Sequence, residues 1–304
     1  MSRPGSSASA HWLQEFLLLA AIWGASFMFM RLAVVDFGPW ATAGIRVGIA
    51  AAMLLPLMIW RGQWSSLRQR WKPTLFVGIF NSGLPFACYA YALLTIPSGW
   101  ASILNATTPL FTACIAWFWL GHRPDRWRLL GLLIGFVGVA LLASSKPAGL
   151  SEDVSHGSAL LASLACLLAT CSYGFAACYS TRYLSQMPAM AVAAGSNFGA
   201  FLVLLPLTVW FAPNHMPGNT AWLAMLAVGL VCTGLAYVLY YRLIARAGPG
   251  NASTITYLIP VFALGYGVGF MDESLSWTML GYGSVILLGT MLSTGWLSPK
   301  KFEK

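Results

Sequence analysis

Residues 78–109 of the chain read GIFNSGLPFACYAYALLTIPSGWASILNATTP, and residues 229–260 read GLVCTGLAYVLYYRLIARAGPGNASTITYLIP. A shift of 151 positions superimposes the two stretches, and several residue types then coincide. The coincident positions are Gly78 with Gly229, Gly83 with Gly234, Tyr89 with Tyr240, Ala101-Ser102 with Ala252-Ser253, and Pro109 with Pro260. An internal repeat of this length indicates that one structural unit occurs twice in the chain.

The similarity extends outward from these stretches to the beginning of each half. At a similar offset, the matching positions are Trp23-Gly24 with Tyr173-Gly174, Pro39 with Pro188, and Leu55-Pro56-Leu57 with Leu205-Pro206-Leu207. Each copy therefore takes up about half of the 304 residues.

The composition indicates that most of the protein surface faces lipid. Hydrophobic residues make up 58% of the chain and charged residues only 8%, and the mean hydropathy is +0.72. Soluble domains carry about a quarter charged residues, and disordered chains are poor in apolar residues. A soluble enzyme and a disordered protein are therefore excluded. The 30 glycines and 16 prolines are also typical of membrane helices.

Ten segments are long and apolar enough to cross a bilayer, which takes about 20 helical residues. They lie at residues 13–35, 39–60, 73–94, 98–120, 127–145, 157–181, 188–211, 219–244, 250–270 and 276–296. The connections are a few residues long, so successive helices are antiparallel neighbours and no room is left for a soluble domain. The N-terminal stretch has no convincing charged leader or cleavage site, so we expect the first segment to be retained.

The repeat and the ten segments predict an all-α integral membrane protein with ten transmembrane helices in two inverted five-helix repeats. The first repeat covers residues 13–145 and the second covers 157–296, with tails at 1–12 and 297–304. Because five is odd, the second copy enters the membrane from the opposite face. Such a pair can open to either side by exchanging the conformations of its halves, which is alternating access.

The basic residues predict the orientation in the membrane. Fourteen of the 17 Lys and Arg fall on the side of the N-terminus, whereas Arg31 and Lys146 fall on the opposite side and Arg46 lies within the second helix. By the positive-inside rule, both tails are cytoplasmic in a bacterial-type inner (plasma) membrane. The net charge of +9 is thus an orientation signal, and we expect no nucleic-acid partner.

Three motifs resemble the signatures of a known family. They are Trp23-Gly24-Ala25-Ser26-Phe27 with Arg31; Tyr91-Ala92-Leu93 through Ala101-Ser102-Ile103-Leu104 to Thr108-Pro109-Leu110-Phe111; and Arg246-Ala247-Gly248-Pro249-Gly250-Asn251-Ala252-Ser253 to Pro260-Val261-Phe262. With Arg46 in helix two, residues 13–296 resemble the ten-helix drug/metabolite transporter (DMT) superfamily, in its EamA-type branch. The family has Gly-Glu after helix four. Here the second half keeps Asp272-Glu273, but the first half has Gly121-His122-Arg123.

The resemblance implies a transporter and not an enzyme. It also implies a cavity near the bilayer midplane, formed mainly by helices one, three, four, six, eight and nine, with helices five and ten at the periphery. Members export amino acids, nucleosides, drugs and other metabolites, so the resemblance leaves the substrate open. We expect a small-molecule substrate, the lipid bilayer as the surroundings, a monomer, and no cofactor.

Polar and aromatic stripes on these helices mark the predicted substrate site. Asn81, Pro85 and Tyr89 recur every four residues and share a helix face. The predicted substrate-binding residues are Trp23, Ser26, Phe27, Asn81, Phe86, Tyr89, Ser102, Asn105, Tyr173, Thr233, Tyr237, Tyr240, Tyr241, Thr256 and Tyr257. Small hydroxyl residues are equally typical of helix packing, and tyrosines of cores and interfaces. Asn81 and Asn105 are the stronger candidates, since a buried amide in a membrane is costly without a partner.

A second group of residues is predicted to act in gating or in shaping the helices. Its members are Arg31, Asp36, Arg46, Pro85, Pro109 and Pro260. The prolines are expected to kink their helices, and Arg31 and Asp36 are expected to pair near the outer surface. For Arg46, a capping or gate-pairing role is favoured over substrate binding, since its head can snorkel toward that surface.

The acidic residues limit the charge of the substrate. All eight fall in connections or near helix ends, whereas a proton-coupled carrier of lipophilic cations would place a carboxylate at mid-membrane. Glu15 begins the first helix and is interpreted as interfacial. Phosphorylated substrates would need more inward cations than Arg46 alone. What remains is a neutral or zwitterionic metabolite, with an amino acid favoured, and the YddG-like exporters of aromatic and other amino acids resemble this chemistry most.

Three alternatives stay open. The nearest is a proton-coupled multidrug efflux pump with Glu15 as its proton site. A channel is also considered, although the inverted repeat argues against it, and an intramembrane enzyme lacks the Gly-x-Ser-x-Gly and His-Glu-x-x-His motifs. The six cysteines form no Cys-x-x-Cys pair and the four histidines have no zinc-ligand spacing, so we expect no metal site.

Overall fold

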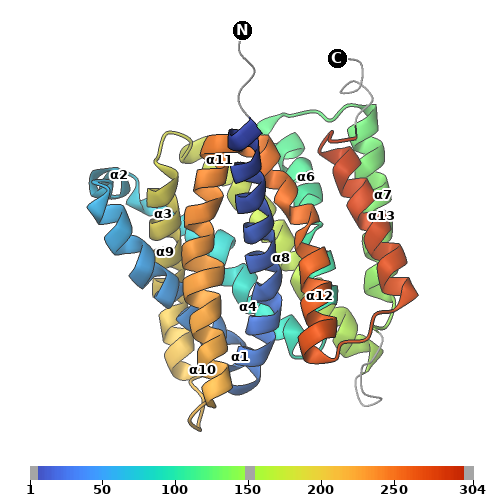
Figure 1. Cartoon of the computed structure of the whole chain (residues 1–304), viewed down its shortest axis with the longest axis horizontal. Helices are drawn as coiled ribbons and strands as arrows, with labels where there is room; N and C mark the ends of the chain where they lie inside the picture. The colour runs from blue at the N-terminus through green and yellow to red at the C-terminus, as the bar shows by residue number, and fades with distance from the viewer. Residues whose placement is uncertain (1–5, 148–154, 298–304) are drawn as a thin grey trace.

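A computed structural model of the chain describes residues 6–147 and 155–297, with side chains except at 6–12, 241 and 247–251. Over this part of the chain the protein is a bundle of helices joined by short turns, with no strand (Figure 1). The beginning of the first helix and the end of the last lie at the same end of the bundle (Figure 1). We call this the terminal end.

The helices follow the same order in both halves of the chain. The first half contains α1 (Ser6–Trp60), α2 (Trp64–Gln69), α3 (Trp71–Gly78), η1 (Ile79–Gly83), α4 (Leu84–Leu93), α5 (Ser98–Asn105), α6 (Thr108–Leu120) and α7 (Arg126–Ser144). The second half contains α8 (His156–Tyr183), α9 (Ala189–Trp210), α10 (Asn219–Leu226), η2 (Ala227–Leu235), α11 (Ala236–Ser253), η3 (Thr254–Tyr257), α12 (Ile259–Met271) and α13 (Trp277–Ser293).

The prediction of ten membrane-crossing helices is confirmed. Among the described residues, eight helical segments are long and apolar enough to cross a membrane, and α13 is a shorter apolar helix. The longest segment, Leu13–Trp60, counts twice because α1 is two helices joined at Gly38, where φ is 73° and ψ is 167°. Glycine occupies this positive-φ position without steric cost, and Pro39 then begins the second helix.

Both halves interrupt their third and fourth helices at matching places. The third helix contains the π-helical turn η1 in the first half, and its counterpart contains η2 in the second half. The fourth helix breaks before α6 in one half and before α12 in the other, and each new segment has a proline, Pro109 or Pro260, in its first turn. Proline suits this position because its missing N–H would have no intrahelical partner there. The internal repeat thus extends to the irregularities of the helices.

The fifth helices of the two halves, α7 and α13, lie side by side at one edge of the bundle (Figure 1). They approach closely because glycines face each other along the contact. A Cβ atom at Gly131 would run into the backbone of Gly289 and Ser293, and one at Gly289 would run into Gly135. Small residues of this kind let membrane helices pack backbone against backbone.

Candidate functional site

A cavity of about 590 Å³ lies inside the bundle. Both halves build its wall. The first half contributes residues of α1, η1, α4, α5, α6 and α7, and the second half contributes residues of α8, η2, α11, η3, α12 and α13. The volume falls in the range of about 300–1,000 Å³ that is usual for small-molecule sites. The helices that line it include all six that the sequence analysis expected to form a substrate cavity.

The predicted substrate-binding residues line this cavity, with two exceptions. Ser102 is fully buried elsewhere and donates its hydroxyl proton to the carbonyl of Gly99 at 2.7 Å, which is a packing role inside α5. The side chain of Tyr241 lies outside the described residues. The sequence analysis missed the mouth of the cavity, where helices five and ten contribute Arg128, Ser293 and Thr294. These two helices therefore lie at the edge of the bundle, but they still contribute to the wall of the cavity.

A π-helical turn accounts for the face of the third helix that meets the cavity. Asn81, Phe86 and Tyr89, which are all predicted substrate-binding residues, line the cavity, whereas Pro85, which was predicted to shape the helix, is buried in the helix packing. A π-turn holds one residue more than an α-turn and shifts the following residues around the axis. The residue five positions after Asn81, not four, therefore faces the cavity.

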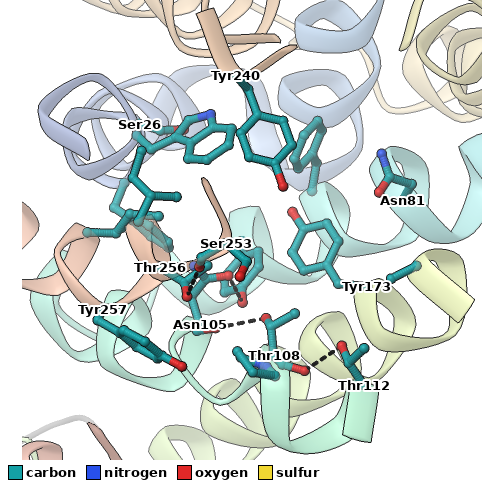
Figure 2. A pocket seen from close by; sticks show the side chains of 18 of the residues that line it. Ser26, Asn81, Asn105, Thr108, Thr112, Tyr173, Tyr240, Ser253, Thr256 and Tyr257 are labelled. Atoms are coloured by element: carbon teal, nitrogen blue, oxygen red, sulfur yellow. Dashed lines mark hydrogen bonds between the residues drawn. The ribbon is translucent and has the colours of Figure 1, made fainter. Parts of the chain in front are cut away.

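Aromatic rings form much of the cavity wall. Phe27 meets the ring of Tyr89 edge-on with 5.5 Å between centroids, and Tyr89 stacks on Tyr173 at 6.3 Å. Trp23 and Tyr240 lie 5.2 Å apart. Figure 2 shows the hydroxyl groups of Tyr173 and Tyr240 directed into the same open space, with Asn81 to one side. The cavity thus offers flat apolar faces with hydroxyl groups at their edges.

Both asparagines that the sequence analysis favoured have protein partners and also line the cavity. Asn81 donates its amide N–H to the hydroxyl of Tyr237 at 3.0 Å, a contact between η1 and α11. Tyr89 donates to Oδ1 of Asn105 at 2.9 Å. These bonds use one atom of each amide, and the bond between Asn81 and Tyr237 ties the two halves of the wall together. Oδ1 of Asn81 and Nδ2 of Asn105 have no partner among the described residues, so they are available to a solute.

Arg46 also lines the cavity. Only 4% of this residue is exposed. Its Nε donates to the hydroxyl oxygen of Thr233 at 2.9 Å, and its guanidinium carbon lies 3.7 Å from the centre of the Phe86 ring. No carboxylate pairs with Arg46 among the described residues. The side chain therefore points into the cavity and does not snorkel to the surface.

At the end opposite the tails, the described residues that line the cavity are buried or half-buried, and beyond them lies the side chain of Glu273, which is 7% exposed and does not line the cavity itself. Its Oε1 pairs with Arg31 at 2.5 Å and accepts from the backbone N–H of Ser98 at 2.7 Å. Its Oε2 accepts from the hydroxyl of Ser98 at 3.0 Å and the N–H of Gly99 at 3.2 Å. One carboxylate thus caps α5 and joins it to α1 and to the end of α12. We call this group the Glu273 clamp.

The expected pair between Arg31 and Asp36 does not form. Arg31 pairs with Glu273, and Asp36 accepts from the backbone N–H of Gly218 at 2.8 Å. The reason is geometric, since the buried carboxylate of Glu273 and the N-terminus of α5 converge on Arg31, whereas Asp36 lies one turn further along α1 and faces the loop before α10. Of the acidic pair Asp272-Glu273, it is therefore Glu273 that holds the closed end of the bundle together.

The opposite, terminal end of the cavity is not closed in this way. Its wall there includes Arg128, Ser253 and Thr294, which are exposed. Tyr257 forms a hydrogen bond of 2.7 Å with Thr294 beside them. The cavity therefore communicates with the terminal end of the bundle and is shut at the Glu273 clamp.

Glu15 does not line the cavity. Its Oε1 pairs with Arg242 at 2.8 Å and with Arg246 at 2.9 Å, and the side chain is 14% exposed. These contacts join α1 to α11 near the terminal end. Glu15 is thus engaged by two guanidinium groups and is separate from the space in which a solute would be held.

A bundle of ten membrane-crossing helices in two repeats, around a cavity that both repeats line, defines a class of membrane transporters. The sequence profile of the EamA-like transporter family matches residues 12–144 and 160–295. The chain therefore belongs to the EamA-like transporter family and is a multi-pass membrane protein.

Similar proteins occur in bacteria and archaea. The "uncharacterized inner membrane transporter YedA" of Escherichia coli (strain K12) is 28% identical over 287 residues, covering 91% of this chain and 88% of the relative. The "uncharacterized transporter YoaV" of Bacillus subtilis is 24% identical over 283 residues, covering 92% of this chain and 95% of the relative. A solved crystal structure aligns with a TM-score of 0.66 and 21% identity, covering 97% of this chain and 99% of the other. This last likeness concerns the fold alone.

Proposed function

We propose that this protein carries small neutral or zwitterionic metabolites, amino acids above all, across the membrane by alternating access. The observation that carries the proposal is the cavity itself, which both repeats line and which is shut at the Glu273 clamp and reaches the terminal end. Inverted repeats place the solute near the midplane where the copies meet. A solute entering from one side would be released on the other when the two ends exchange their states.

The lining of the cavity supports the choice of amino acids. Aromatic rings from Trp23, Tyr89 and Tyr240 offer apolar surface to a side chain, and the free amide atoms of Asn81 and Asn105 offer a hydrogen-bond acceptor and a donor. No Asp or Glu lines the cavity among the described residues. Such a wall fits a solute with an apolar body and polar ends better than a lipophilic cation, which would need a countercharge.

The side to which the cavity opens follows from the same arrangement together with the charge bias of the sequence. With both tails in the cytoplasm, the terminal end of the cavity faces the cytoplasm and the Glu273 clamp faces outward. The conformation described would then accept a solute from inside the cell, as an exporter must in one of its states.

The test is transport by the purified protein in liposomes. Labelled amino acids, a nucleoside and a lipophilic cation are compared with and without a pH gradient. The proposal predicts saturable amino-acid flux that Glu15→Gln leaves independent of the gradient. Cation uptake driven by protons and lost in Glu15→Gln would instead establish the multidrug pump, and flux that does not saturate would indicate a channel.

A further inference from the structure

We propose that Arg46 binds the carboxylate of the transported solute, which makes the substrate class metabolites with one carboxylate group, such as amino acids. This inference rests on the proposed transport function and goes beyond it by naming the chemical group and the residue that recognises it.

The first argument is the missing partner of a buried charge. Arg46 is 4% exposed within a membrane-crossing helix and lines the cavity. Buried guanidinium groups are normally paired with an anion, because an unpaired charge at membrane depth is costly. Among the described residues no carboxylate pairs with Arg46 or lines the cavity. An anionic group on the solute would supply the missing partner.

The second argument is the direction of the hydrogen bonds around Arg46. Thr233 donates its hydroxyl proton to the carbonyl of Val228 at 2.8 Å, within the π-helical turn η2. Its oxygen is therefore free to accept, and it accepts from Nε of Arg46. This bond uses one of the five N–H groups of the guanidinium. The four N–H groups on the two terminal nitrogens have no protein partner among the described residues.

The third argument is the planar support of the guanidinium. Its carbon lies 3.7 Å from the centre of the Phe86 ring, so the ring covers one face of the group. With Nε fixed by Thr233 and one face held against Phe86, the fork of terminal N–H groups is oriented before a solute arrives. A carboxylate matches this fork with two parallel hydrogen bonds.

The fourth argument comes from the other repeat. At the offset of 150 positions that matches Leu55-Pro56-Leu57 with Leu205-Pro206-Leu207, Arg46 corresponds to Ser196. Ser196 is buried and donates its hydroxyl proton to the carbonyl of Ala193 at 3.1 Å. The same helix position is therefore filled by a neutral residue in one copy, which indicates that the fold does not need a cation there. We therefore attribute the charge of Arg46 to solute binding and not to folding.

The neighbouring groups fit the remainder of an amino acid. Tyr237 lies one helical turn after Thr233, and Asn81 bonds to Tyr237. The free Oδ1 of Asn81 lines the same cavity as Arg46 and can accept from an ammonium group. The charge of Arg46 and the charge of one carboxylate then cancel inside the cavity.

The experiment is competition in liposomes that carry the purified protein. L-Leucine, L-phenylalanine and L-threonine compete against the labelled solute, each beside its amide, which lacks only the negative charge. We expect each free acid to compete about tenfold or more better than its amide, as expected for the loss of hydrogen bonds to a charged group. In Arg46→Asn, which keeps a polar side chain but removes the charge, this preference disappears while the amides still compete. Arg46→Lys keeps part of the preference, since a lysine keeps the charge but loses the fork.

Arg123→Gln is the matched control, because it removes an exposed arginine that lies outside the cavity. It should keep the acid-over-amide ratio of the unchanged protein. Equal competition by acids and amides in the unchanged protein, or a ratio that survives in Arg46→Asn, would overturn the inference. Failure of the transport proposal is a different result: no saturable flux is seen, but the preference for acids is still measurable as thermal stabilisation of the detergent-solubilised protein.

Discussion

At the scale of single residues, Glu273 joins three segments of the chain at the closed end of the bundle. It lies in the short loop after α12, yet its two oxygens receive four hydrogen bonds, from Arg31, from the backbone N–H and hydroxyl of Ser98, and from the backbone N–H of Gly99. A carboxylate at the N-terminus of α5 also interacts favourably with the helix dipole. The closed end of the cavity therefore depends on one side chain.

We expect Glu273→Gln to lower the stability of the protein. The amide keeps the size of the side chain and one accepting oxygen, but it loses the charge that Arg31 and the end of α5 require. The loss should be about 1–3 kcal/mol, as for removal of a charged hydrogen-bond partner. Thermal unfolding in detergent measures it.

The control for this change is Asp272→Asn, one position earlier. It removes an identical charge from a side chain that is exposed. The backbone of Asp272 has a φ of 52°, a conformation that asparagine adopts readily. Its melting temperature should stay close to that of the unchanged protein. If both variants lose the same stability, the effect comes from net charge and the clamp has no special role.

At the scale of helices, the contact between α7 and α13 makes a contrasting prediction for two equivalent glycines. Gly131 in α7 corresponds to Gly281 in α13 at an offset of 150 positions. A Cβ at Gly131 would collide with the backbone of the partner helix, whereas one at Gly281 would meet nothing within 4 Å. The same change should therefore have opposite effects in the two repeats.

We expect Gly131→Ala to destabilise the protein by about 1–3 kcal/mol through overpacking. Gly281→Ala should be neutral or stabilise it by up to about 1 kcal/mol, because alanine has the better helix propensity. Melting temperatures of the two purified variants test both expectations in one comparison. Equal destabilisation would show that α7 and α13 do not pack as described.

Helices are also the scale at which sequence reasoning succeeded and failed most clearly. The number of helices and the repeat were predictable, because apolar length and matched glycines and prolines are local features of the sequence. The π-turns in the third and eighth helices were not, because a π-turn depends on packing against neighbouring helices. The pairing of Arg31 with Glu273 joins residues 242 positions apart, and no local pattern distinguishes Glu273 from the nearer Asp36.

At the scale of the whole molecule, the two repeats differ at the positions that form the Glu273 clamp. An offset of 151 positions relates Glu273 to His122, and the offset of 150 that holds in the first helix relates Arg31 to Thr181, the residue next to Arg182. His122 is exposed, and the guanidinium of Arg182 lies over the rings of Trp119 and Tyr183 at 5.7 and 5.6 Å. The terminal end thus has the arginine of a second clamp but not the carboxylate. This difference favours the conformation that is shut at the Glu273 end.

We expect His122→Glu to supply the missing carboxylate and to raise the population that is closed at the terminal end. An ion pair at an exposed site contributes about 0.5–1 kcal/mol, which corresponds to a shift of about two- to fivefold. Labelling of Thr294→Cys by a water-soluble maleimide, in a background without other cysteines, should slow by at most that factor, because the rate follows the fraction of protein that is open at this end. Thr294 is suitable because it is exposed at the cavity mouth.

Two further variants decide whether the shift comes from a clamp. Glutamine at position 122 carries no charge, so in His122→Gln the cysteine of Thr294→Cys should be labelled at the same rate as in the protein with His122. Combining His122→Glu with Arg182→Gln removes the proposed partner and should restore fast labelling. Slow labelling that persists in the combined variant would mean that the glutamate acts through another contact.

The π-turns at matching places in the two repeats also indicate the order in which the gene acquired its features. An extra residue found at one place in both copies is inherited from a single ancestral unit, so it precedes the duplication. The contrasts between the copies, Arg46 against Ser196 and Glu273 against His122, arose after the duplication. Each copy could then diverge, so that one could hold the charge of the solute and the other could close one end.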